Sequence, residues 1–464
     1  MIRTRAHALF TKLCCHFFGT PSQILISLIL PLSTLFAGET VQAHWEENPA
    51  SWDSLDIEPT REEALSWYHS RRLDGHAEEV LPAPLPLRLA LKHFPRAGAQ
   101  PVLLVHGLSQ NDRGLDSRLK QYSFARYLHA QGFDVWVGNL RNSGTPGFES
   151  ETPPGPQHWT VEDYAIDDFP ALVNYVADRT RQRPFLIGHS LAAWIMDGWL
   201  AGLEFNSHGI AVANPLRAAA RRNRIQGIIT VAGLYNLRWE HMLADWKRNP
   251  IENEADYYHS NYELELLARS EALSWIVPRL PSLPLNWIDS LVHLPLSSIP
   301  FIGHRLDRAY AKFSSHLIES PLFNLFYYAP NTDPEMVRTH VEDGMESISP
   351  KLLEQIANAY VCGRRSEYHP NSLGCEVPGY DYTQVRKDAV AMQVPQLLIA
   401  GDRDRLASAY QIENFGYEPA RKTTRNVDIT FRVMSGAGHL DILGGKNTEE
   451  EIFKPVAEWM QARH

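Results

Sequence analysis

The chain has 464 residues, with 44 lysines and arginines against 54 aspartates and glutamates, so its formal net charge is −10. Hydrophobic residues make up 44% and charged residues 21%, which are ordinary values for a packed globular protein and exclude a wholly disordered chain. The negative balance argues against an unspecific nucleic-acid binder, since such a protein needs a basic face. Four cysteines are too few for a disulfide scaffold.

The N-terminus has the pattern of a secretory signal peptide. Basic residues precede an apolar run at 24–36, and Val41-Gln42-Ala43 follows with small residues spaced as at a signal-peptidase site. The apolar run contains Pro31 and is shorter than the roughly 20 residues that span a bilayer. We therefore expect export after cleavage of residues 1–43, with an uncleaved membrane anchor as the alternative.

From Leu87 onward, short apolar runs alternate with amphipathic stretches, which is the pattern of parallel βαβ units. The expected strands lie at residues 87–94, 101–105, 133–137, 185–187, 225–231, 396–400 and 427–434. The expected helices include residues 116–131, a helix that begins near Thr160, and residues 191–203. The last of these is apolar almost all round, as a buried helix would be. The pattern predicts an α/β fold with a mostly parallel central sheet flanked by helices.

Residues 235–394 interrupt this alternation. The interval holds no convincing βαβ unit and is rich in Trp, Pro and helix-like segments, so we interpret it as one large, mainly helical cap insertion. The core would then comprise residues 44–234, which include an N-terminal extension, and residues 395–464. The apolar stretch at 273–302 would either form the cap's own core or face an acyl chain and lipid.

The segment Gly188-His189-Ser190-Leu191-Ala192 lies between an expected strand and the expected buried helix. A serine on a sharp strand-to-helix turn is presented for attack, and small residues two places before and after it let the backbone pass close by. The first amides of the helix add hydrogen-bond donors and partial positive charge. The strict pattern ends in glycine, where this chain has Ala192. We expect Ser190 to be a nucleophile, and the alternative is an ordinary serine that caps a helix.

A second motif, His106-Gly107-Leu108, follows the expected strand at 101–105. Gly107 permits a tight turn that can aim the main-chain N–H of Leu108 at an oxyanion. Together with the N–H of Leu191, this gives the two donors that a tetrahedral intermediate requires. We expect His106 to orient the loop and assign it no proton transfer.

An acid and a base follow the last two expected strands, in the motifs Gly401-Asp402-Arg403-Asp404 and Gly436-Ala437-Gly438-His439. A serine hydroxyl is a poor nucleophile until a base removes its proton, and a carboxylate must hold that base in one tautomer. The order Ser190, Asp404, His439 is the one used by enzymes with this kind of serine turn. Asp402 is a competing acid, and we expect it to turn or cap its loop instead.

Two cysteines, Cys362 and Cys375, remain after removal of the signal peptide. In an oxidising compartment they would form a disulfide that closes a short loop, worth about 3 kcal/mol. One alternative is a metal site with His369 as a third ligand, for which no familiar ligand spacing is present. The other is a pair of free thiols, if the chain is not exported.

Five segments carry a family resemblance over roughly residues 87–234 and 395–464. They are Val105-His106-Gly107-Leu108, Asp134-Val135-Trp136-Val137-Gly138-Asn139 with Arg141, Gly188-His189-Ser190, Gly401-x-x-Asp404-x-Leu406-Ala407 and Gly438-His439-Leu440-Asp441. These segments resemble the α/β-hydrolase superfamily and, within it, the gastric and lysosomal acid lipases. The resemblance implies an α/β-hydrolase fold with Ser190 as nucleophile, Asp404 as acid and His439 as base. It also implies an oxyanion hole made by the amides of Leu108 and Leu191.

We therefore expect a serine hydrolase, a lipase or esterase, that cleaves carboxylic esters of apolar acyl groups without a metal or organic cofactor. The expected partner is a small-molecule or lipid ester, with transient lipid-surface contact through the cap, and not a nucleic acid. Two alternatives stay open. One is an acyltransferase that uses the same triad, and the other is a non-catalytic binding protein on the same scaffold.

Overall fold

The computed structural model describes residues 51–57, 87–145, 149–150, 159–237, 323–368, 379–424 and 426–463. The expected signal peptide, the apolar stretch at 273–302 and the residues His369 and Cys375 lie outside these ranges. The expected disulfide and the alternative metal site therefore stay predictions. Within the described ranges, no helix is long and apolar enough to cross a bilayer.

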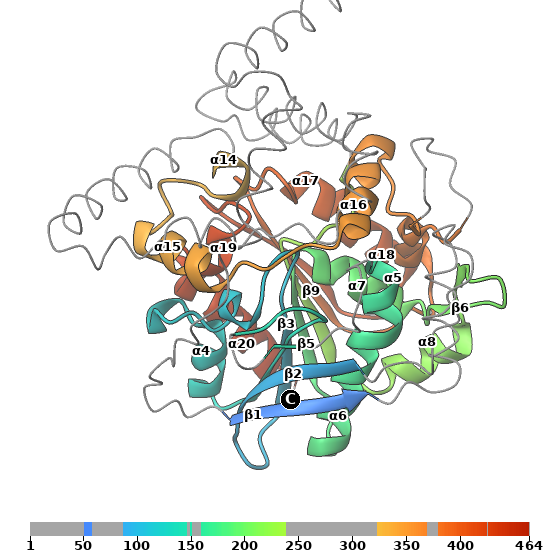
Figure 1. Cartoon of the computed structure of the whole chain (residues 1–464), viewed down its shortest axis with the longest axis horizontal. Coiled ribbons are helices and arrows are strands. Elements are labelled where there is room, and N and C mark those ends of the chain that lie inside the picture. The colour runs from blue at the N-terminus through green and yellow to red at the C-terminus, as the bar shows by residue number, and fades with distance from the viewer. Residues whose placement is uncertain are drawn as a thin grey trace, which may run out of the picture. The chain divides into compact units, whose positions relative to one another are not determined.

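An eight-stranded sheet lies at the centre of the described part, with the strand order β1-β2-β4-β3-β5-β8-β9-β10 (Figure 1). The strands from β4 to β10 in this order are parallel, whereas β2 is antiparallel to both β1 and β4. Two short strands, β6 and β7, form a separate pair. The strand bounds are β1 Ser51–Ile57, β2 Leu87–Phe94, β3 Pro101–Val105, β4 Asp134–Gly138, β5 Phe185–His189, β6 Glu204–Phe205, β7 Ala211–Val212, β8 Gly227–Val231, β9 Gln396–Gly401 and β10 Ile429–Met434.

Helices connect and cover these strands. The helix bounds are α4 Phe124–Ala130, α5 Val161–Asp163, α6 Phe169–Thr180, α7 Leu191–Leu200, α8 Pro215–Arg222, α14 Phe323–Phe326, α15 Pro334–Asp343, α16 Pro350–Cys362, α17 Ala409–Gln411, α18 Glu418–Thr423, α19 Asp441–Gly444 and α20 Lys454–Gln461. Short 3-10 turns lie at Asp112–Gly114, Lys120–Tyr122 and Tyr382–Lys387, and π-helical turns lie at Tyr164–Asp168, Ile412–Tyr417 and Glu449–Phe453.

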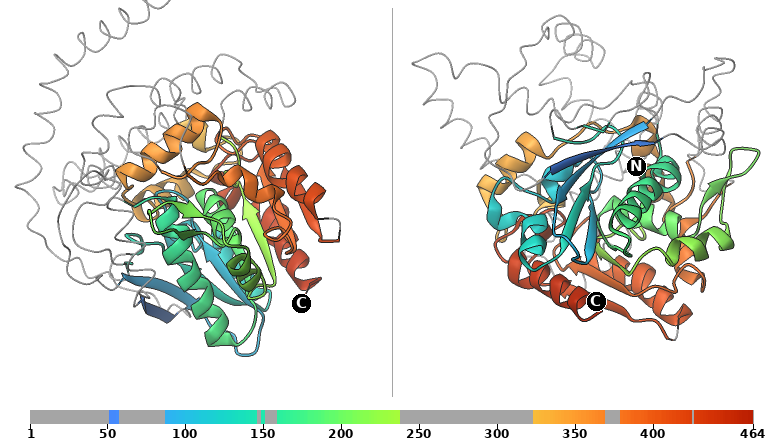
Figure 2. Two further views of the ribbon diagram at one scale, coloured as in Figure 1. Left: turned by 90° about the vertical axis from the view of Figure 1, so that its right-hand side faces the viewer. Right: turned by 90° about the horizontal axis from the view of Figure 1, so that it is seen from below.

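Helices on both faces bury the central strands. Every residue of β3, β5, β8 and β9 is buried, as their continuous apolar runs require. Helices α4 and α20 lie on one face, where Phe124 of α4 stacks on Phe453, in the π-helical turn just before α20, with ring centroids 4.5 Å apart. Helices α6 and α7 lie on the other face, where Phe169 packs edge-on against Trp199 (Figures 1 and 2). The expected α/β-hydrolase fold, a mostly parallel sheet flanked by helices, is confirmed.

The strand at 87–94 has the expected bounds and is antiparallel to β4, because β3 and β4 are parallel and the few residues between β2 and β3 cannot hold the crossover that would make β2 parallel to them. One local expectation differs from the structure. The helix expected at 116–131 begins only at Phe124, where Ser123 caps it by accepting the N–H of Arg126.

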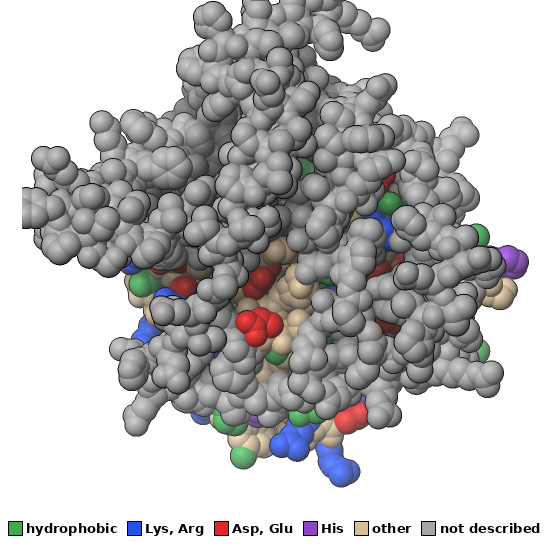
Figure 3. Space-filling view, in the orientation of Figure 1, with side chains coloured by type: hydrophobic (Ala, Val, Ile, Leu, Met, Phe, Trp, Pro, Cys, Tyr) green, Lys and Arg blue, Asp and Glu red, His purple; other side chains and the backbone are tan. Residues whose placement is uncertain are grey.

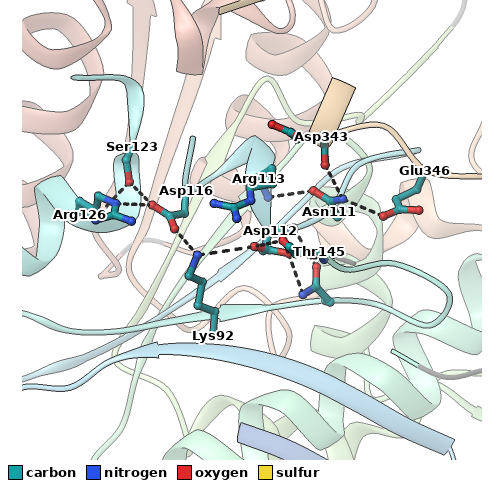
Figure 4. Close-up of polar contacts among 11 residues, drawn as sticks. Lys92, Asn111, Asp112, Arg113, Asp116, Ser123, Arg126, Thr145, Asp343 and Glu346 are labelled. Carbon is teal, nitrogen blue, oxygen red and sulfur yellow. Dashed lines mark hydrogen bonds and ion pairs between the residues drawn. The ribbon is translucent and has the colours of Figure 1, made fainter. Parts of the chain in front are cut away.

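A buried charge cluster joins the loops that follow β3 and β4. Nζ of Lys92, on β2, lies 2.5 Å from the carboxylate of Asp116 and 4.0 Å from that of Asp112 (Figure 4). Asp112 also accepts the N–H of Thr145 (3.0 Å) and the side-chain amide of Asn139 (3.2 Å). Because these charges are paired away from water, the two loops are fixed at the carboxyl edge of the sheet.

The described part of residues 235–394 contains α14, α15, α16 and a 3-10 turn. The sheet continues with β9, whose first residue is Gln396. The assignment of residues 235–394 as a separate cap, and of residues 44–234 and 395–464 as the two parts of the core, stays a prediction.

Candidate active site

Ser190 occupies the turn between β5 and α7, and its backbone is strained. Its φ is 54° and its ψ is −115°, a conformation that residues with a Cβ rarely adopt. A Cβ on Gly188 would lie 2.7 Å from Cε of Met196 and 2.9 Å from Cβ of Ala192, so only glycine fits there. The N–H of Ser190 donates to the carbonyl oxygen of Val231 (2.9 Å), and this bond anchors the turn to β8.

His439 lies between Ser190 and Asp404. Its Nε2 is 2.8 Å from Oγ of Ser190, and its Nδ1 is 2.8 Å from Oδ2 of Asp404. A carboxylate only accepts, so Nδ1 carries the ring proton and Nε2 accepts the O–H of Ser190. All three side chains are buried. The structure thus brings together side chains from loops that follow three different strands.

The two acids of the loop after β9 have separate contacts. Oδ1 of Asp404 accepts the N–H groups of Leu406 (2.8 Å) and Ala407 (2.7 Å), which orients its other oxygen toward the imidazole. Oδ1 of Asp402 accepts the N–H of Gly436 (2.6 Å) and ties this loop to the one after β10. Asp402 therefore turns its loop, as expected, and Asp404 is the acid that contacts His439.

Asp441 holds the loop that carries His439, a contact that the sequence alone did not predict. Its carboxylate accepts the N–H of Gly438 (3.1 Å), the N–H of Tyr328 (2.8 Å) and the side-chain amide of Asn331 (2.8 Å). Burial raises the pKa of Asp441 to about 6. Asp441 thus attaches the segment after α14 to the loop that carries His439.

The expected oxyanion donors lie beside the serine turn. Gly107 passes so close that a Cβ on it would lie 2.9 Å from Cβ of Ser190. Leu191 is the first residue of α7, where main-chain N–H groups have no partner within the helix. Leu108 and Leu191 both line one small pocket. Their action on an oxyanion stays a prediction.

Strained backbone gathers at the same edge of the sheet. Of the five described non-glycine residues with positive φ, four follow the ends of β3, β4, β5 and β8; these are Ser109, Asn142, Ser190 and Ala232. Such conformations cost roughly 1–3 kcal/mol each and cluster at functional sites. Ligands of open parallel sheets bind at the carboxyl ends of the strands, so the strained residues and the side chains of Ser190, Asp404 and His439 mark one location.

His106 and Arg141 support the walls of this site. Burial lowers the pKa of His106 to about 4, and its contacts with the main-chain oxygen of Gly107 (2.9 Å) and the N–H of Leu140 (3.2 Å) orient the loop after β3. The buried guanidinium of Arg141 lies 2.6 Å from the carboxylate of Asp168. Both side chains therefore have structural contacts that explain their burial.

Glu346 is a further residue that the sequence did not indicate. Its Oε1 accepts the side-chain amide of Asn111 (2.7 Å) and the N–H of Gly144 (3.2 Å) (Figure 4). Its own N–H donates to the carbonyl oxygen of Ser109 (2.9 Å), and it lines the same pocket as Leu108. Burial raises the pKa of Glu346 to about 7.

Acidic side chains are visible near the centre of the face in Figure 3, and basic ones at its lower edge.

Comparison with known proteins finds similarity to α/β hydrolases over part of the chain. A family model of the alpha/beta hydrolase fold matches residues 100–273. The chain is similar to Lipase member K of Homo sapiens, with 33% identity over 93 residues, 19% of this chain and 23% of that protein. It is also similar to Sterol esterase 2 of Saccharomyces cerevisiae, with 31% identity over 130 residues, 27% of this chain and 21% of that protein.

Among solved structures, the chain is similar to a monoacylglycerol lipase of Paleococcus ferrophilus, with a TM-score of 0.43 and 16% identity over 82% of this chain and 100% of that chain. The match to the two curated relatives spans less than a quarter of their length, 23% and 21%. The strand order and the matched family model therefore carry the assignment of the fold.

Proposed function

We propose that this chain, which is similar to α/β hydrolases of the lipase and esterase type, is a serine hydrolase that cleaves carboxylic esters of apolar acyl groups. The observation that carries the proposal is the unbroken contact from Asp404 through His439 to Ser190, with 2.8 Å at each step. A hydroxyl in this position can lose its proton to the imidazole as it attacks, which is what nucleophilic catalysis by serine requires.

Each residue has one role in the reaction. Oγ of Ser190 attacks the ester carbonyl carbon while its proton moves to Nε2 of His439, and Asp404 stabilises the imidazolium. The N–H groups of Leu108 and Leu191 donate to the oxyanion, a contribution of roughly 3–4 kcal/mol for each donor in a comparable enzyme. The intermediate collapses when the alcohol leaves with the proton of the imidazolium. Water then attacks the acyl-enzyme, gives a proton to His439, and releases the carboxylic acid and the serine.

The similarity to a lipase and to a sterol esterase supports an apolar acyl group. The pocket beside the expected oxyanion donors contains apolar side chains, Leu108, Leu140, Leu191, Ile348 and Leu352, among polar ones such as Ser109, Asn142 and Glu346. Transfer of apolar surface onto apolar side chains is favourable by roughly 25 cal/mol for each Å² removed from water. We expect activity to rise with acyl length, because each added methylene group removes more apolar surface from water.

Ser190→Ala tests the nucleophile. The substitution is expected to lower kcat for a p-nitrophenyl ester by a factor on the order of 10⁶, below detection, because only background catalysis remains. The matched control is Ser207→Ala, which changes a serine in the turn between β6 and β7. Circular dichroism and thermal unfolding check that both variants fold. Undiminished turnover by Ser190→Ala would overturn the assignment.

Product analysis separates hydrolysis from acyl transfer. In the presence of a competing alcohol, the proposal predicts the carboxylic acid as the main product. Preferential formation of the new ester would favour an acyltransferase that uses the same three side chains. A binding protein on this scaffold would neither turn over the ester nor react with a fluorophosphonate.

We also propose that residues 1–43 direct export and are removed, which the basic start, apolar run and small residues before position 44 support. In the exported protein, Cys362 and Cys375 form a disulfide. N-terminal sequencing of the exported protein should begin at residue 44, and thiol labelling should require prior reduction. An intact N-terminus in the membrane fraction would favour the anchor.

A further inference from the structure

The ring of His189, one residue before the proposed nucleophile, lies between two loops of the site. It is 2% exposed. Its Nε2 lies 3.0 Å from the main-chain oxygen of His439, and its Nδ1 lies 3.0 Å from Oε1 of Gln110. The same Oε1 accepts the N–H of Gly107 at 3.0 Å. The ring therefore lies between the loop that carries the base and the loop after β3 that carries the oxyanion donor.

Both neighbours of this ring are oxygen acceptors, and a neutral imidazole has one proton to donate. Burial lowers the pKa of His189 to about 3, so the ring is neutral at physiological pH. Oε1 of Gln110 already accepts the N–H of Gly107, whereas a buried main-chain oxygen that loses its donor is destabilising. The proton is therefore assigned to Nε2, which donates to the carbonyl of His439, and Nδ1 then makes no hydrogen bond to Oε1 of Gln110.

We propose that His189 is a positioning residue for the base, acting through the hydrogen bond from its Nε2–H to the main-chain oxygen of His439; this inference rests on the proposed function. The imidazole of His439 is held at its outer end by Ser190 and Asp404. The bond from His189 holds the other end, the main chain from which that imidazole extends. Misplacement of a catalytic group by about 1 Å can lower the rate roughly 10²-fold.

The neutral state of His189 also matters for the reaction. The centroids of the His189 and His439 rings are 5.1 Å apart. When His439 accepts the serine proton, a second positive charge at that distance would oppose the transfer. A neutral donor can hold the loop of the base without this repulsion, which a lysine or arginine in its place could not do.

Two substitutions separate the roles of the two ring nitrogens. Glutamine extends an amide N–H to about the place of Nε2, whereas asparagine reaches only to about the place of Nδ1. His189→Gln is expected to keep kcat within about threefold of the wild type. His189→Asn is expected to lower kcat roughly 10- to 100-fold with KM unchanged, because the base is misplaced while ester binding is not.

The matched control is His340→Gln, which changes another buried histidine that lines the same small pocket as His189. It should leave kcat unchanged. If His189→Asn keeps full activity, or if His189→Gln loses as much as His189→Asn, the inference is wrong. A structural role alone would lower the melting temperature of His189→Asn and His189→Gln together, without this difference in kcat.

A second measurement does not depend on turnover. The proton on Nδ1 of His439, bonded to Asp404, gives a downfield NMR resonance whose sharpness reports a fixed imidazole. We expect this resonance to persist in His189→Gln and to broaden or vanish in His189→Asn. If the wild type hydrolyses no ester, the proposed function fails, and the resonance still decides the inference: its persistence in His189→Asn would overturn it.

Discussion

Glu346 offers a quantitative test of the electrostatics beside the site. Glu346→Gln removes the charge and keeps the shape, and the amide oxygen of glutamine can accept the two hydrogen bonds from Asn111 and Gly144. Burial raises the pKa of Glu346 to about 7, from its ordinary value of 4.5. A carboxyl group whose pKa is raised in the folded state contributes stability that is fully present below the unfolded value and is lost as the pH rises through the folded value.

The size of the effect follows from the two pKa values. Their difference is about 7 less 4.5, or about 2.5, and 1.36 kcal/mol for each pKa unit sets an upper limit of about 3 kcal/mol. Because the Glu346 side chain is partly accessible, solvent screening reduces the expected difference in the free energy of unfolding to about 1–3 kcal/mol. At pH 8, Glu346→Gln should therefore unfold with a free energy about 1–3 kcal/mol higher than the wild type.

Urea unfolding measured from pH 4 to pH 8 tests this expectation. The difference between variant and wild type should grow with pH and approach zero at pH 4, where both side chains are neutral. Glu342→Gln is the matched control, because Glu342 pairs with Arg338 within α15. A loss of stability in Glu346→Gln at pH 8, or a gain that does not depend on pH, would refute the reasoning.

Two further substitutions test the acid of the triad and the buried charge cluster. Asp404→Asn should lower kcat about 10⁴-fold in the ester assay with the fold retained, because asparagine favours the wrong tautomer of His439; a fully active variant would contradict this. Lys92→Met should lower the free energy of unfolding by about 1.5–3 kcal/mol, because it removes one of the two cations that pair with the buried carboxylate of Asp116, while Arg126 remains. If the variant resists denaturant as well as the wild type does, this ion pair is dispensable for stability.

The central strands could be predicted because parallel strands covered on both faces are continuous apolar runs. The run at 101–105 and the strand β3 have the same bounds. The turn at Ser190 could also be predicted, because its small residues have a local steric cause: a Cβ at position 188 would lie too close to Ala192 and Met196. The residues that directly follow the expected strands could be assigned to one site, since the carboxyl ends of parallel strands meet at one edge of the sheet.

Contacts that depend on distant pairings could not be predicted in this way. The direction of β2 depends on which neighbour it pairs with, and its apolar pattern is the same for either direction. Gln110 and Glu346 are ordinary polar residues in the sequence, and their roles arise only when Gln110 meets His189 and Glu346 meets Asn111 across the fold. Ser123 displaced the expected helix start because a cap outweighs weak helical periodicity.

A single labelling experiment tests most directly whether the hydroxyl at the turn is activated. The purified protein is treated with a fluorophosphonate, digested, and mapped by mass spectrometry, with Asp404→Asn and His439→Ala treated alongside. The account predicts one phosphonylated residue, Ser190, in the wild type and strongly slowed labelling in both variants. Labelling of another serine, or labelling of Ser190 at the same rate in all three proteins, would contradict it.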